Sequence, residues 1–444
     1  MNLHIKNGRI IDPANEIDAV ADLYIADGRI AAVGRAPRDF RAAEVIDAKK
    51  FIVSPGWVDL SARLREPGQD QKATIAGETR AAAAGGVTTL CCPPDTRPVI
   101  DTPAVVELIH QRAAQSGRAR VVCLGALTQE LKGEVLAAMH SLKRAGCVGV
   151  SNAMAPMVNT EVLRRALEYA RTCDLTVFLH AEDAWLAGQG CIHEGAFSTR
   201  LGLPGIPETA ETVAVARDLL LIEHTGARAH FCRLSTARAA MLVAEAMRRG
   251  LPVTTDVSVQ HLFHTDAETA GFNSAYHVRP PFRSPLDRDG LRKALRAGVI
   301  SAVCSDHQPQ DQDAQRQPFA ATEPGISALE TWLPLMLRLV RDKVLDLPAA
   351  VAACTIKPAR ILGSPAGTLT AGASADVCIF DPQEDWVVAE DTLLSTGKNT
   401  PLLGEHVQGR VRVTLLGGKV IHRAARSSPS RSWRRSARKR PSGE

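Results

Sequence analysis

Three apolar segments of the sequence end in residues whose side chains can bind metal ions, move protons or hold anions. The first runs into Asp59 and continues to Arg63 and Arg65, the second ends at His180, and the third ends at Asp306. Imidazole and carboxylate groups are ligands of catalytic zinc and act as general acids and bases, whereas arginine binds carboxylates. These residues could form one site if the fold brings the three segment ends together.

Repeated strand-then-helix units over about 300 residues would bring such ends together. The strand-like runs include 119–124, 175–179, 251–257 and 299–305, and the helical patterns include 133–145, 211–223 and 326–340. Units of this kind predict a parallel sheet closed into a (β/α)₈ barrel, in which the chemistry lies at the carboxyl ends of the strands.

Both ends of the chain have a different sequence pattern, in which short apolar runs are separated by turns. The Asp27-Gly28 pair between two such runs is a strong hairpin signal. The predicted fold class is therefore α/β: a TIM (β/α)₈ barrel over 55–363, with a small β-sandwich domain built from both termini, over 1–54 and 364–421.

Composition and charge exclude several classes of protein. The chain has 444 residues, of which 45% are hydrophobic and 23% charged, as in an ordinary globular protein. Its net charge is +5, but residues 421–444 hold eight of the 53 basic residues and one of the 48 acidic ones, which leaves −2 for the rest. The body is therefore not basic and a nucleic-acid partner is disfavoured, while 422–444 is predicted to be a basic disordered tail.

Two features of the sequence indicate where the protein is located. The ten cysteines have no regular spacing, and the sequence contains no long apolar span. Secreted disulfide frameworks have dense, regular cysteines, and a membrane helix needs about 18 or more consecutive apolar residues. These features predict a cytoplasmic protein without a membrane segment.

Several short motifs make residues 1–421 resemble the cyclic amidohydrolases, and most closely the long (type I) dihydroorotases of pyrimidine biosynthesis. They are Pro-Gly-Trp-Val-Asp-Leu at 55–60, Leu-Arg-Glu-Pro-Gly at 64–68, Gly-Gly-Val-Thr-Thr at 85–89, Leu-Pro-Gly-Ile-Pro at 203–207, Ser-Asp-His at 305–307 and Asn-Thr-Pro at 399–401. The resemblance implies a barrel of the amidohydrolase type.

The resemblance also shows that most of the family's metal ligands are missing. Two histidines, a bridging carboxylate and a further histidine are replaced, and only His180 and Asp306 match the metal set. The lost positions are Ser61, Arg63, Asn152, Ala153 and Arg233. Catalytic zinc needs three protein ligands, and a guanidinium about 5 Å from a divalent ion costs roughly 6 to 7 kcal/mol at an effective dielectric constant of about 20.

We therefore expect no metal cofactor and no catalytic residue, with His180 and Asp306 as relics of the metal site. Arg65 matches the family's substrate-binding arginine and is likewise interpreted as a relic, since other expected substrate contacts are replaced. Those replacements are Asp95, Arg279 and Gln310. Arg63 and Arg233 are predicted to fill the emptied cavity and to pair with Asp306 and Glu66. A metal site rebuilt from other histidines is disfavoured; the candidates are His224, His230, His261, His264 and His277.

The resemblance implies a function without catalysis. Some bacteria pair an inactive dihydroorotase-like chain with the catalytic chain of aspartate carbamoyltransferase in a dodecamer of six plus six, and this sequence is similar to that non-catalytic chain. The alternative is an active, metal-dependent cyclic amidohydrolase with a remodelled site, acting as a dihydroorotase or like a hydantoinase or allantoinase, and holding zinc.

Overall fold

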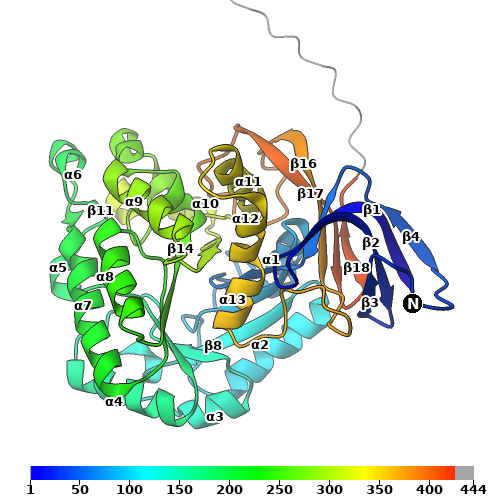
Figure 1. Ribbon diagram of the computed structural model, residues 1–444. Coiled ribbons are helices and arrows are strands. Elements are labelled where there is room, and N and C mark those ends of the chain that lie inside the picture. Colours follow the sequence, from blue (N-terminus) through cyan, green and yellow to red (C-terminus); the bar gives the residue numbers. More distant parts are fainter. Residues whose placement is uncertain (1, 426–444) are drawn as a thin grey trace, which may run out of the picture.

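The computed structural model describes residues 2–425 and contains the predicted TIM barrel (Figure 1). Eight strands pair in parallel, in chain order, in a single sheet. The strands are β6 (Trp57–Asp59), β7 (Val87–Cys92), β8 (Arg120–Ala126), β9 (Gly149–Ser151), β10 (Thr176–Leu179), β13 (Ala229–Phe231), β14 (Val253–Ser258) and β15 (Ala302–Cys304).

The sheet closes just beyond the ends of its first and last strands. Ala62 forms a parallel bridge with His307, and the Arg63 amide donates to the His307 carbonyl oxygen at 2.8 Å. Strand β7 is buried along its whole length, as expected of a strand in a parallel barrel, and four of its six residues are apolar. The closure places residues that follow β6 directly beside residues that follow β15.

Helices surround the barrel, and short helices and strands line its upper loops. The helices are α1 (Ile75–Ala84), α2 (Pro103–Ser116), α3 (Met139–Arg144), α4 (Thr160–Thr172), α5 (Ala184–Ala187), α6 (Ala196–Leu201), α7 (Glu208–Thr225), α8 (Ala237–Arg248), α9 (Pro285–Arg296), α10 (Gln312–Gln315), α11 (Trp332–Arg341), α12 (Leu347–Cys354) and α13 (Ile356–Ile361). The loop strands are β11 (Ile192–His193) and β12 (Gly205–Ile206). No helix within residues 2–425 has the length and apolar character to span a bilayer.

Strands from both chain ends make the β-sandwich domain, as predicted (Figure 1). They form one mixed sheet in which β5 joins the N-terminal strands to the C-terminal ones. The strands are β1 (Leu3–Asp12), β2 (Ile17–Ala26), β3 (Arg29–Val33), β4 (Glu44–Asp47), β5 (Ile52–Pro55), β16 (Val377–Val387), β17 (His406–Leu416) and β18 (Lys419–Arg423).

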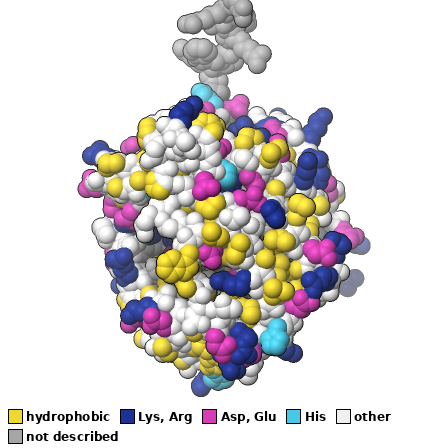
Figure 2. All heavy atoms as spheres, turned by 90° about the vertical axis from the view of Figure 1, so that its left-hand side faces the viewer, with side chains coloured by type: hydrophobic (Ala, Val, Ile, Leu, Met, Phe, Trp, Pro, Cys, Tyr) yellow, Lys and Arg dark blue, Asp and Glu magenta, His cyan; other side chains and the backbone are white. Residues whose placement is uncertain are grey.

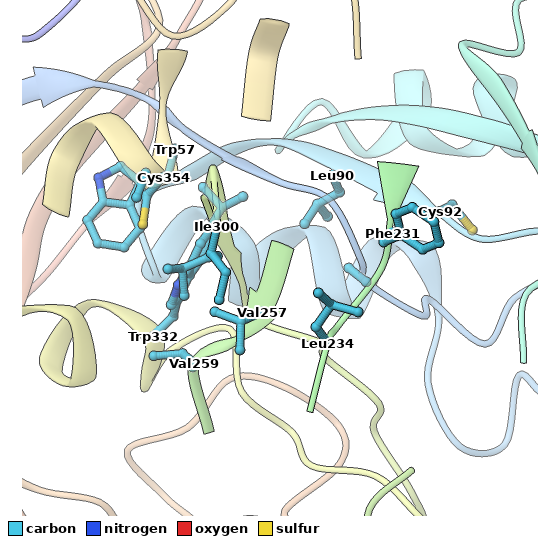
Figure 3. Close-up of a cluster of buried hydrophobic side chains, with 14 of the residues drawn as sticks. Trp57, Leu90, Cys92, Phe231, Leu234, Val257, Val259, Ile300, Trp332 and Cys354 are labelled. Carbon is cyan, nitrogen blue, oxygen red and sulfur yellow. The ribbon is translucent and has the colours of Figure 1, made fainter. Parts of the chain in front are cut away.

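A large apolar core lies between the barrel strands and the surrounding helices. Figure 3 shows part of it, where Trp57 of β6 and Trp332 of α11 lie close to Ile300 and Val257. The two indole rings meet edge to face, with centroids 5.0 Å apart. This packing holds the strands, and therefore their carboxyl ends, in fixed positions.

Two predicted helices are shorter than their sequence patterns. Within 133–145 the helix begins only at Met139, because Gly133 adopts a φ of +72° and the following residues form a turn against 127–129. Within 326–340 the helix begins at Trp332, since Ile326 is extended and accepts a hydrogen bond from the Gln308 amide at 2.8 Å.

The predicted start of the tail at 422 also differs from the structure. Strand β18 continues to Arg423, because His422 pairs with Thr414 of β17 and the Arg423 guanidinium contacts Glu44 at 2.7 Å. The rest of the predicted tail, from 426 onward, lies outside the described residues.

Candidate functional site

Residues from different strand ends meet around the Asp306 carboxylate at the closure of the barrel. Asp306 Oδ1 accepts hydrogen bonds from Ser61 Oγ at 3.2 Å, Gln308 Nε2 at 3.1 Å and Arg233 Nη1 at 3.4 Å. Arg233 Nη1 also donates to Ser61 Oγ at 3.0 Å. The predicted pairing of Arg233 with Asp306 is therefore present. Although burial alone would lower it, the Asp306 carboxylate raises the pKa of Arg233, which keeps the guanidinium charged.

Arg63 lies between two carboxylates. Its Nε donates to Asp95 Oδ2 at 2.7 Å, and its Nη1 lies 3.7 Å from Asp306 Oδ1, while only 5% of its side chain is exposed. Burial alone would raise the pKa of Asp95, but the charge and hydrogen bond of Arg63 outweigh burial and lower it. Asp95 is thus the main ion-pair partner of Arg63.

The predicted pairing with Glu66 is wrong. Glu66 faces the start of α1, where its carboxylate accepts a hydrogen bond from the Ile75 amide at 2.6 Å, and it forms an ion pair with Arg112. A carboxylate at a helix N-terminus satisfies free amide groups and interacts favourably with the helix dipole, which accounts for this orientation.

The segment after β9 offers no carboxylate to the site. Asn152 accepts from Thr128 Oγ1 at 2.7 Å and donates to the Leu131 carbonyl oxygen at 3.0 Å, so its amide holds the neighbouring loop. Ala153 contributes only a methyl group. The Asn152 amide is therefore engaged away from the Asp306 group.

His180 lies beside a second buried ion pair. Its Nε2 is 3.7 Å from Glu182 Oε2, and Arg279 Nε donates to the same carboxylate at 3.1 Å. Burial lowers the pKa of His180. Burial alone would raise the pKa of Glu182, but its contacts with His180 and Arg279 lower it to about 2. Glu182 is therefore a carboxylate already matched by a cation.

Arg65 lies at the mouth of the same region without a carboxylate partner. Its Nε donates to the Pro309 carbonyl oxygen at 2.9 Å, and its Nη1 donates to Gln69 Oε1 at 3.3 Å. None of the ion pairs within residues 2–425 involves Arg65. Burial, followed by repulsion from Arg63, lowers the pKa of Arg65 to about 10.

Four of the site residues have an unusual, positive φ angle; Arg65 has +61°, and the other three lie at matching places beyond the barrel strands. Ala153, Arg233 and Asp306 each lie two residues beyond the end of β9, β13 or β15, and their φ angles are +51°, +53° and +49°. Non-glycine residues adopt this left-handed conformation at a cost of about 1–2 kcal/mol. The strand ends are thus shaped in the same way although their side chains differ.

The donor set does not fit a zinc ion. Within residues 2–425, no group of three or more histidine, cysteine, aspartate or glutamate side chains is placed to hold a metal ion. The guanidinium of Arg233 hydrogen-bonds directly to Asp306, one of the two residues that the resemblance matches to the family's metal ligands. Three of the five candidate histidines contact other groups: His230 contacts Thr254 and Asp256, His261 contacts Pro280, and His277 contacts Thr322.

Sequence reasoning missed several contacts that complete the site. Met154 Sδ lies 3.0 Å from Arg233 Nη2, and nothing in the sequence pattern marks this residue. Asn399, which belongs to a recognised motif, donates to the Gln308 and Gly325 carbonyl oxygens at 2.9 and 2.8 Å and so holds the loop that follows Asp306. The role of Asn399 is therefore to position the loop.

The fold and the strand-end site define the class of protein: a barrel of the amidohydrolase type. A solved L-hydantoinase (dihydropyrimidinase) from Arthrobacter aurescens superimposes with a TM-score of 0.84 at 24% identity, over 94% of this chain and 95% of its own. A D-hydantoinase (dihydropyrimidinase) from Thermus sp. gives a TM-score of 0.79 at 24% identity, over 94% of each chain. At these identities the likeness shows the fold.

More similar relatives show the family. The Dihydro-orotase-like family model matches residues 49–239, and the Amidohydrolase family model matches residues 291–422. A "Dihydroorotase-like protein" of Pseudomonas aeruginosa is 50% identical over 95% of this chain and 100% of its own length, and a "Dihydroorotase" of Anaeromyxobacter dehalogenans is 44% identical over 95% and 98%. The chain therefore belongs to the dihydroorotase-like family of amidohydrolases.

Proposed function

We propose that this chain is a non-catalytic, dihydroorotase-like scaffold subunit of pyrimidine biosynthesis. The observation that carries the proposal is the contact between the Arg233 guanidinium and the Asp306 carboxylate. In the family that the chain resembles, both positions bind metal, so here a fixed cation occupies the place of a ligand. An ion pair of this kind satisfies the carboxylate and repels a divalent ion.

Without a metal ion, the chemistry of the family has no nucleophile at neutral pH. Bulk water has a pKa near 15.7, and a bound zinc ion lowers it to about 7. The described residues offer a charged arginine at the place where a base or hydroxide would act. Arg63, Arg65 and Asp95 also enclose a cavity of only about 10 Å³, which leaves no room for a cyclic amide substrate there.

The proposed partner is the catalytic chain of aspartate carbamoyltransferase, in an assembly of six plus six. This part of the proposal rests on the resemblance to non-catalytic chains of that kind. The face over α5, α7 and α8 supports an interaction role, because it exposes Trp185, Leu220 and Met241 at 86%, 67% and 71%. Figure 2 shows this side of the molecule, where hydrophobic side chains are scattered among charged ones. Tryptophan and methionine are enriched in protein interfaces relative to the rest of the surface.

The proposed location is the cytoplasm. All ten cysteines are free thiols, and nine of them are buried. Buried free cysteines pack as small hydrophobic residues and are typical of proteins in a reducing compartment.

A working cyclic amidohydrolase is the second candidate. The observation that favours it is that relatives named dihydroorotase are 44% identical over nearly the whole chain. Under this alternative the chain would bind zinc through residues other than the family set and would hydrolyse dihydroorotate or a hydantoin.

One purified sample separates the two candidates. We expect less than about 0.1 zinc per chain, no turnover of dihydroorotate or hydantoin, and co-elution with the transcarbamoylase catalytic chain in gel filtration. An active dihydroorotase assayed in parallel is the control. Stoichiometric zinc with turnover would overturn the non-catalytic role, and separate elution of the two chains would overturn the partner.

A further inference from the structure

A cavity of about 690 Å³ lies at the amino ends of the barrel strands, at the opposite end of the barrel from Asp306. Its walls come from residues at the starts of β10, β13 and β14 and from the end of α13. Ligand sites in proteins ordinarily occupy about 300–1,000 Å³. Because the chemistry of TIM barrels lies at the carboxyl ends of the strands, this cavity is separate from the site described above.

Polar side chains at the starts of three neighbouring strands point toward the barrel axis and line the cavity. Phe178 packs among interior side chains of other barrel strands, and its ring lies 5.1 Å from that of His230. Thr176 and Arg228 each lie two residues before one of these rings. Since side chains alternate along a strand, both lie on the inner side. Thr254 joins them, because its hydroxyl hydrogen-bonds to His230 Nδ1 at 2.8 Å.

The cavity has an excess of positive charge. Of the described residues that line it, Lys143, Arg228 and Arg360 are cationic and Asp174 is the one acid. The Arg228 guanidinium lies 2.7 Å and the Lys143 amine 3.6 Å from the Asp174 carboxylate. Arg360 takes part in none of the ion pairs of residues 2–425. Three positive charges less one negative leave +2, and a hollow lined by one sign of charge concentrates ions of the other sign.

The ion pairs of Asp174 do not remove its two cations from the reach of a ligand. The Asp174 side chain is 72% exposed, and those of Lys143 and Arg228 are 41% and 54% exposed. Exposed ion pairs of this kind contribute about 0–1 kcal/mol. An anion of higher charge can therefore compete with Asp174 for the same two side chains.

Apolar side chains complete the walls on two sides. Leu251 and Pro252 precede β14 on one side, while Ile361 and Leu362 lie at the end of α13 on the other. Ile361 and Leu362 also pack against interior side chains of the barrel, which fixes this wall in place. A bare inorganic anion would leave these walls in water, whereas an attached apolar group would cover them and gain about 25 cal/mol per Å² of buried apolar surface.

We propose that this cavity binds a phosphate monoester that carries an apolar group. A phosphate monoester has a second pKa near 6 and is mostly a dianion at pH 7.5, so its charge equals the excess charge of the cavity. Its phosphate group contacts Arg360 and Arg228, because guanidinium groups match phosphate oxygens. Its apolar group lies between Leu251 and Ile361. The inference is independent of the scaffold role, since none of these residues belongs to α5, α7, α8 or the barrel mouth.

Phenyl phosphate is the probe that tests this site. At pH 7.5 and constant ionic strength, about 5 mM phenyl phosphate should raise Tm by about 2 °C, the shift that a Kd near 0.1 mM produces in a chain of this size. The chain should also broaden the ³¹P NMR signal of the probe. Inorganic phosphate lacks the apolar group and benzenesulfonate lacks the second charge, so each should bind about tenfold or more weakly.

Variants locate the binding. Arg360→Gln should weaken the binding of phenyl phosphate about tenfold. Arg35→Gln, which removes an exposed arginine after β3, should leave it unchanged. Asp174→Asn should tighten the binding, because it frees Arg228 and Lys143 from their carboxylate partner. The φ of +50° at position 174 is one that asparagine adopts readily, so this variant should keep the fold.

Several results would overturn the proposal. They are an unchanged Tm with phenyl phosphate, full binding in Arg360→Gln, weaker binding in Asp174→Asn, and equal binding of inorganic phosphate or benzenesulfonate. Loss of binding in Arg65→Gln would also overturn it, since the anion would then lie at the barrel mouth. Co-elution with the transcarbamoylase catalytic chain, measured without the probe, reports on the scaffold proposal separately.

Discussion

At the scale of single residues, arginine at position 233 is the change that most alters the site. A histidine there would offer a neutral nitrogen to a metal ion, whereas the guanidinium brings a permanent charge and several hydrogen-bond donors. Its contacts with Ser61, Asp306 and Met154 use those donors inside the barrel. Under the proposed non-catalytic role, Arg233 therefore forms a structural ion pair at a position that the resemblance matches to a metal ligand.

Arg233→Ala should destabilise the fold by about 3 kcal/mol, because it leaves the buried Asp306 carboxylate with weaker partners. Urea unfolding at pH 7.5 measures the effect. Arg249→Ala at the surface should change the unfolding free energy by less than about 1 kcal/mol. In Arg233→Met combined with Asp306→Leu, most of the loss should be recovered, since neither charge is left alone. A wild-type unfolding curve for Arg233→Ala would show that the ion pair contributes nothing.

His261 provides a pH prediction at the same scale. Burial lowers its pKa to about 4, from an ordinary value of 6.5. Because the folded-state pKa is depressed, the unfolded chain takes up a proton below pH 6.5 that the folded chain does not, and stability is lost as pH falls from 6.5 toward 4.

Replacing His261 removes this proton linkage. Between pH 7.5 and 5, the unfolding free energy of the wild type should fall by about 2 kcal/mol more than that of His261→Asn. Urea unfolding at the two pH values measures the difference. His140→Asn, at an exposed helical position, is the matched control. Parallel pH dependence of the wild type and His261→Asn would contradict the prediction.

The position of a site residue was predictable from the sequence where it depends on a local motif, whereas its contact partners were harder to predict. The strand-end positions of His180 and Asp306, and the pairing of Arg233 with Asp306, follow from the motifs and from the cost of a buried charge. The partner of Arg63 did not follow, because Glu66 lies three residues away in sequence, whereas Asp95 lies 32 residues away and is brought close only by the fold. Only the packing of Glu66 against the first turn of α1 decides between them.

At the scale of elements, α7 is the helix with an unexpected surface. It buries Val215 and Ile222 on one side but exposes Val213 and Leu220 on the other. A surface helix of a globular protein ordinarily has a polar outer face. We therefore expect the outer face of α7, with that of α8, to take part in the proposed assembly.

Leu220→Glu combined with Met241→Glu should abolish co-elution with the transcarbamoylase catalytic chain, because charges at the centre of an apolar interface are costly to desolvate. Both side chains are exposed, so the unfolding free energy should change by less than about 1 kcal/mol. Val20→Glu, at a 74% exposed valine of β2, should leave co-elution intact. Unchanged co-elution of the double variant would place the interface elsewhere.

Element boundaries were less predictable than element types. The strands of the barrel and the long α7 follow from apolar runs and helical spacing. The late starts of two helices, at Met139 and Trp332, were not predictable from the helical spacing of the sequence. A backbone turn precedes the first helix, and a parallel bridge between Ile326 and His307 precedes the second. Such tertiary contacts are not encoded in local periodicity.

At the scale of the whole molecule, the barrel and the β-sandwich keep an enzyme-like architecture around a site filled with charge pairs. Neither chelator nor zinc should then alter stability. Treatment with EDTA, or addition of 100 μM zinc, should each shift Tm by less than about 1 °C, whereas a true zinc protein loses the stabilisation that its bound metal provides. A chelator-induced fall of several degrees in Tm would indicate a structural or catalytic metal.

The left-handed strand ends bear on whether the divergence of this chain is reversible. Ala153, Arg233 and Asp306 hold the same conformation although one carries a methyl group, one a cation and one a carboxylate. Because the surrounding sheet fixes the backbone, ligand side chains restored at 61, 63, 153 and 233 would project from an unchanged main chain. If the proposed non-catalytic role holds, these positions are therefore the first at which substitutions to histidine or aspartate should be tried to introduce metal binding.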